Sequence, residues 1–258
     1  MRLIAALIIL VFGGQASHAS PDTDRLVDAM GIPALMQAFS VDGQVAGETI
    51  NKAFLNGQGG DVWAETVRRM YDPARLEHEM RSAMAATLDR DTALQAALFF
   101  ESDLGQRVID LETQARRAMQ SPELEAVARA APSGQSDQMS DFLTIRDLID
   151  RNTEATLTAQ AAFYDGVALT SGQPDIRPDP KTQYDEVKAE TESWLRGYFA
   201  LAQSPLSPDD VAIYTAFWDT DVGRTLDDAL FAAFADSYKT LSFGLGQAVG
   251  RLLPQNDL

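Results

Sequence analysis

Histidine and cysteine, the side chains best suited to nucleophilic and transition-metal chemistry, are nearly missing from this chain. There is no cysteine, so disulfides, thiolate metal sites and thiol catalysis are excluded. His18 lies in an expected leader, and His78, between Glu77 and Glu79 on a predicted helix, is expected at the surface. No Gly-x-Ser-x-Gly elbow, dinucleotide fingerprint, phosphate loop or EF-hand loop is present. We therefore predict no catalytic residue, no metal site and no cofactor.

Carboxylates are the abundant reactive group. The chain has 38 acidic and 21 basic residues and a formal net charge of −17. Such a surface repels phosphates and anionic lipids, so no nucleic-acid partner is expected. Two carboxyl groups in one cleft could still hydrolyse a polymer of the cell envelope. An apolar-ligand carrier is the other alternative, suggested by the 12 phenylalanines, and it needs an apolar cavity.

The first 19 residues have the form of a secretory signal peptide. Arg2 precedes an apolar run at 3–12, and Ser17-His18-Ala19 is a small-x-small cleavage signal. The run is about half the ~20 residues that span a bilayer. We expect cleavage after Ala19, no membrane span and a periplasmic location.

Helical periodicity dominates the rest of the chain. One stripe recurs every four residues, at Leu76, Met80, Met84 and Leu88. Cap-then-proline pairs at 72–73, 121–122 and 207–208 mark helix starts. Alternating β-branched runs are absent. The predicted fold class is all-α, with helical hairpins packed as a bundle or a short superhelical array.

Two helical units are expected, at 20–135 and 136–258, which could also form one continuous domain. The second unit should begin with a helix of about 30 residues, running from 136 to 171. Asn152 interrupts its apolar stripe and should bond a neighbouring helix or loop, a ligand contact being the alternative. A loop rich in Pro and Gly follows at 172–183.

The C-terminal helix, predicted at 221–253, carries a stripe of small residues. Ser242, Gly246 and Gly250 lie along one face, and no charge appears between Thr240 and Gly250. Small residues allow two helices to approach closely. We expect this face to pack on another helix of the same chain, with a homodimer through the C-terminal helix as the alternative.

One seven-residue motif occurs twice, which indicates an internal duplication. The copies are Phe99-Phe100-Glu101-Ser102-Asp103-Leu104-Gly105 and Phe217-Trp218-Asp219-Thr220-Asp221-Val222-Gly223. In the structural interpretation, Ser102 and Thr220 cap the following helix, and Gly105 and Gly223 permit close backbone approach. In the functional interpretation, the aromatic and acidic side chains of both copies flank a groove for a peptide or small ligand.

The pattern aromatic-aromatic-x-Ser/Thr-x-x-Gly, followed by an amphipathic helix, resembles an uncharacterised exported bacterial family called domain of unknown function 2059, here in two copies. Segments 105–112, 147–152 and 162–166 are also similar to that family. The family often has proline where this chain has Asp103 and Asp221, and both residue types suit a first helical turn. The resemblance implies export and a helical fold, and it brings no catalytic or binding residues.

Together these observations predict a non-enzymatic, soluble periplasmic helical protein. Its expected role is to bind a protein or peptide partner in the cell envelope.

Overall fold

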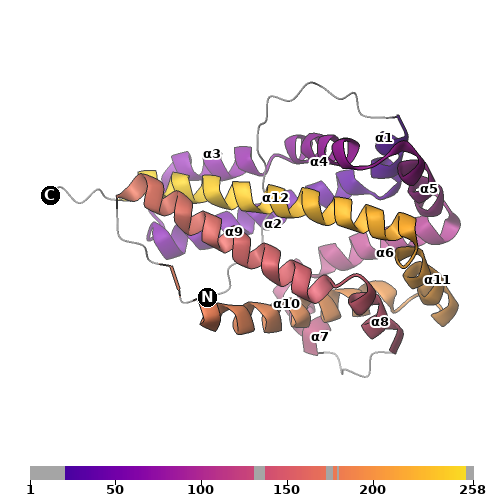
Figure 1. Cartoon of the computed structure of the whole chain (residues 1–258). Helices are drawn as coiled ribbons and strands as arrows, with labels where there is room; N and C mark the ends of the chain where they lie inside the picture. The colour runs from indigo at the N-terminus through magenta and orange to yellow at the C-terminus, as the bar shows by residue number, and fades with distance from the viewer. Residues whose placement is uncertain (1–20, 131–136, 173–176, 179, 254–258) are drawn as a thin grey trace.

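The computed structural model describes residues 21–130, 137–172, 177–178 and 180–253, and the regular elements within them are α-helices (Figure 1). In chain order they are α1 (Pro21–Ala29), α2 (Ile32–Phe54), α3 (Gly60–Met70), α4 (Pro73–Thr87), α5 (Arg90–Phe100), α6 (Asp103–Ala118), α7 (Pro122–Ala130), α8 (Asp137–Ile145), α9 (Leu148–Ser171), α10 (Pro180–Gln203), α11 (Pro208–Trp218) and α12 (Asp221–Leu252). The predicted all-α class is confirmed. The expected leader lies outside the described residues.

Two long helices, α9 and α12, run parallel through the middle of the fold (Figure 1). Near their first turns, Arg151 of α9 forms an ion pair with Asp228 of α12 at 3.0 Å. Near their last turns, the Thr170 hydroxyl donates to the Gln247 carbonyl at 3.0 Å. The remaining helices pack around this pair.

The small-residue stripe of α12 is the surface that meets α9. A Cβ atom on Gly246 would lie 2.9 Å from the carbonyl carbon of Phe163, and one on Gly250 would lie 2.7 Å from the Val167 oxygen. Real side chains do not fit at such distances, so the two backbones can approach only because both positions are glycine. The predicted packing within the chain is confirmed. A homodimer through α12 stays a prediction, and the stripe that suggested it is covered by α9.

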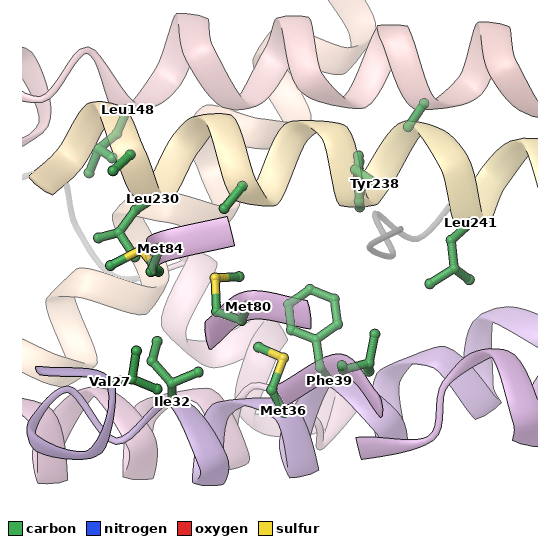
Figure 2. Packing of buried hydrophobic residues seen from close by; sticks show 14 of the residues in the cluster. Val27, Ile32, Met36, Phe39, Met80, Met84, Leu148, Leu230, Tyr238 and Leu241 are labelled. Atoms are coloured by element: carbon green, nitrogen blue, oxygen red, sulfur yellow. The ribbon is translucent and has the colours of Figure 1, made fainter. Parts of the chain in front are cut away.

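The first helices build the apolar core against the other side of α12 (Figure 2). The stripe predicted on α4 is buried throughout, and the Asp72 carboxylate caps that helix by accepting from the Arg75 N–H at 2.9 Å. Met80 and Met84 lie between α12 and Met36 of α2 (Figure 2). Burying a methionine or leucine side chain contributes roughly 1.5–3 kcal/mol, so this contact anchors the first third of the chain.

The single long helix expected at 136–171 is wrong, because the chain breaks between α8 and α9. Asp147 has a φ of 48°, in the left-handed region, which ends one helix before the next begins. The adjacent Arg146 pairs with the buried Asp227 at 2.5 Å, and its guanidinium lies 3.7 Å from the centre of the Trp218 ring. Those tertiary contacts redirect the chain at a point where the local periodicity continues.

Two smaller expectations in this region are also corrected. The Asn152 amide donates to the Leu148 carbonyl at 2.7 Å, within its own helix and not to a neighbouring one. The loop after α9 is shorter than expected, since α10 already begins at Pro180. Gly172, with a φ of 64°, ends α9 as predicted. The division into units at 20–135 and 136–258 stays a prediction.

Candidate functional site

The two motif copies form two helix–turn–helix joints with the same local geometry. The first turn (residues 99–105) joins α5 to α6, and the second turn (residues 217–223) joins α11 to α12. The Ser102 hydroxyl accepts from the Gly105 N–H at 3.1 Å and donates to the Phe99 carbonyl at 2.6 Å. The Thr220 hydroxyl makes the equivalent bonds at 3.0 and 2.6 Å. Both residues cap their helices, as the structural interpretation expects.

The glycine in each turn lies against the end of the preceding helix. A Cβ atom on Gly105 would be 2.6 Å from the Cα of Phe100, and one on Gly223 would be 2.7 Å from the Cα of Trp218. A side chain at either position would therefore push the two helices of the joint apart. The motif glycines are explained by this close approach.

The aromatic residues of the two turns meet each other in the core. The Phe99 and Phe217 rings are stacked, with centroids 4.0 Å apart and planes at 10°. Phe100 packs edge-on against Phe217 at 5.3 Å and lies 5.9 Å from Trp218. Phe100, Phe217 and Trp218 are all buried, and Phe99 is partly buried. The structure thus joins the two turns through one aromatic cluster, formed by these four residues.

Three of the four acidic residues of the two turns bind nearby arginines. Glu101 forms a two-point ion pair with Arg25 of α1, with both N–O distances at 2.5 Å. In the second turn, Asp219 and Asp221 both bind Arg224, at 2.8 and 2.7 Å. The four acids of the two turns, Asp103 included, are all exposed.

An open hollow of about 690 Å³ lies beside the first turn, between α1 and the α5–α6 joint. Its lining residues are Pro21, Asp24, Arg25, Asp28, Ala29, Glu101 and Gln106. The Gln106 amide closes the base by donating to the carbonyls of Ala29 and Phe100, at 3.0 and 2.7 Å. The hollow is therefore lined by three carboxylates and one guanidinium, and it borders a motif residue.

Glu101 of the hollow is not suited to be the general acid of a hydrolase. A general acid at neutral pH requires a raised pKa. Hydrogen bonds from Arg25 instead lower the pKa of Glu101. Burial raises the pKa of Glu79 and of Glu112, and neither residue lines the hollow. The charged lining also differs from the apolar cavity that a carrier of apolar ligands requires.

A polar cluster around Glu112, which we did not single out in the sequence, lies where α6 meets α10 and α11. The Tyr214 hydroxyl donates to the Glu112 carboxylate at 2.9 Å, and the Tyr198 hydroxyl donates to the Glu112 carbonyl at 3.2 Å. Glu112 falls on the inward stripe of α6, between the buried Val108 and Ala115. An acid on an apolar stripe was the signal that could have revealed this cluster.

His78 is exposed on α4, as expected. Within the part of the chain that the structure describes, no group of three or more His, Asp or Glu residues is arranged to hold a metal ion. In the same residues, no helix has the length and apolarity to cross a bilayer.

Comparison with known proteins supports the family resemblance over part of the chain. The fold is all-α and contains two capped helical joints that share an aromatic cluster. Residues 74–132, which include the first turn and α4 to α7, match the model of a family described as an uncharacterized protein conserved in bacteria, DUF2059. The second turn lies outside that match. No curated protein and no solved structure matches the chain.

Proposed function

We propose that this chain is an exported, non-enzymatic helical protein of the bacterial envelope that binds a protein or peptide partner at the hollow beside the first turn. The observation that carries the proposal is the Arg25–Glu101 pair in the wall of this hollow, whose side chains are 42% and 36% exposed. Exposed ion pairs contribute little to stability, because solvent screens the two charges. A partner can therefore replace one half of the pair at little cost to folding.

The lining of the hollow favours a basic partner segment. Asp24, Asp28 and Glu101 outnumber the single lining cation, Arg25. Asp24 and Asp28 also share Arg81, at 3.3 and 2.5 Å, which holds them in place on α1. The net charge of −17 attracts a cationic partner over a distance and disfavours polyanions. A Lys- or Arg-bearing peptide segment fits this chemistry best.

Export and internal duplication belong to the same proposal. The leader predicted at 1–19 supports a periplasmic location. The duplication is supported by the matching lengths of α5 and α11, which both have 11 residues, and by the equivalent cap bonds of Ser102 and Thr220. In this proposal the first turn carries the binding hollow, and the second turn serves mainly to hold the first in place.

Site-specific photocrosslinking in living cells tests the proposal. A photoreactive residue at position 28, in the hollow, should give a discrete adduct with an envelope protein or peptide. The matched control places the same residue at position 221, whose side chain is 98% exposed in the second turn. A Glu101→Lys change should abolish the adduct at position 28, and an Asp219→Lys change should not. Equal labelling from positions 28 and 221 would contradict the proposal.

A further inference from the structure

Glu112 connects a helix of the first half of the chain to helices of the second half. It projects from α6. The Tyr198 hydroxyl of α10 donates to its backbone carbonyl, and the Tyr214 hydroxyl of α11 donates to its carboxylate. Tyr214 is 1% exposed and Glu112 is half-buried, so the contact between them is largely covered by the surrounding helices. Phe142 of α8 packs on the Tyr214 ring, with the two centroids 5.2 Å apart.

The cations near Glu112 are bound to other carboxylates. Arg146, in the link between α8 and α9, is held by Asp227 of α12 at 2.5 Å. Arg116, one turn further along α6, is held by Asp42 of α2. Arg146 favours the ionised form of Glu112 at longer range, as does the hydrogen bond from Tyr214. Burial outweighs both effects, and the pKa of Glu112 is raised.

We propose that Glu112 is an acid-responsive joint, which takes up a proton as the pH falls and thereby tightens the contact of α6 with α10 and α11. The protonated carboxyl keeps an oxygen that accepts the Tyr214 hydrogen bond, and it gains an O–H donor. It no longer carries a charge that must be kept partly out of water. This inference does not depend on the binding proposal, because the hollow beside the first turn is lined by other residues.

The sign of the effect follows from proton linkage. An unfolded glutamate has a pKa of about 4.3. Because folding raises the pKa of Glu112, the folded state binds the proton more tightly than the unfolded state. The ionised carboxylate therefore weakens the fold at pH values above the folded pKa. That penalty disappears as the pH falls below about 4.3.

Urea unfolding of the wild type and of Glu112→Gln between pH 4 and pH 8 tests the proposal. The neutral amide imitates the protonated carboxyl. At pH 8 the unfolding constant of the wild type should exceed that of the variant by about tenfold for each unit by which folding raises the pKa. The difference should shrink towards pH 4. Parallel profiles for the two proteins across this range would overturn the proposal.

Two further measurements separate proton binding from a merely structural role. The first is a carbon-13 NMR titration of the wild type, which needs no folded variant. The Glu112 carboxyl should titrate with a midpoint above about pH 4.3. A midpoint at or below that pH would overturn the proposal. Tyr214→Phe removes a hydrogen bond that favours the carboxylate, so it should move the midpoint upward. Glu101→Gln is the matched control, since the pKa of Glu101 is lowered and its profile should run in the opposite direction.

Discussion

The stacked pair Phe99–Phe217 is predicted to couple the two motif turns energetically. Replacing either residue with leucine keeps most of the buried apolar surface and removes the ring-to-ring contact at 4.0 Å. Aromatic pairs contribute about 0.5–1.5 kcal/mol beyond the area they bury. In a double-mutant cycle, Phe99→Leu and Phe217→Leu should therefore be non-additive by about that amount. The double variant should lose less stability than the sum of the two single losses.

Urea unfolding followed by circular dichroism at 222 nm measures the four free energies of unfolding in this cycle. The slope of each transition should stay unchanged, which keeps the comparison within one two-state scheme. A second cycle, which pairs Phe99→Leu with Trp63→Phe, is the control. The Trp63 indole bonds to the Gly47 carbonyl of α2 at 2.9 Å, which is a contact outside the two turns, so these two losses should add. Additivity of Phe99 and Phe217 within about 0.3 kcal/mol would refute the coupling of the two turns.

Three other predictions concern an ion pair of the core, a close helix contact and an exposed ion pair. Asp227→Ala removes the buried carboxylate that binds the half-buried Arg146 and should lower the free energy of unfolding by about 3 kcal/mol in urea titrations. Gly246→Ala should lower the melting temperature, because its Cβ collides with the Phe163 backbone, whereas Gly244→Ala meets only a flexible methionine end and should be tolerated. Glu101→Gln should melt below the wild type at pH 7, and this gap should close as acid protonates the wild-type carboxylate.

Local chemistry in the sequence predicted the helices and their ends well. The Asp72 carboxylate caps α4, and Ser207 and Asp210 form the capping box that begins α11. Each of these contacts depends on residues three positions apart, so the sequence contains the whole interaction. The same holds for Ser102 and Thr220 in the two turns.

The break between α8 and α9 depends on contacts that the local sequence does not contain. Periodicity continues through 145–149, and only the pairing of Arg146 with Asp227 shows why the chain turns there. The partner lies 81 residues away along the chain. The expectation for Asn152 failed for the opposite reason, since its amide bonds locally to the Leu148 carbonyl of its own helix and needs no neighbour.

The two motif turns of the candidate site could be found from the sequence, but the contacts that their residues make in space could not. Motif comparison found both turns, but it could not show that Phe99 would stack on Phe217 while Glu101 would pair with Arg25. The hollow arises only when α1 packs beside the first turn. Glu112 lies between the buried Val108 and Ala115 of α6, yet the tyrosines that bind it come from helices far along the chain.

Interior polar contacts and apolar contacts contribute differently to the fold. Methionine and leucine stripes can pack against many partners, so they stabilise the core without specifying which helices meet. Three polar contacts join particular segments of the chain instead: Asp42 with Arg116, Glu112 with Tyr214, and Arg146 with Asp227. Two of them set an arginine against a carboxylate, which keeps both charges compensated. In the third the carboxylate accepts from a neutral hydroxyl, which does not offset the effect of burial, and the pKa of Glu112 is raised.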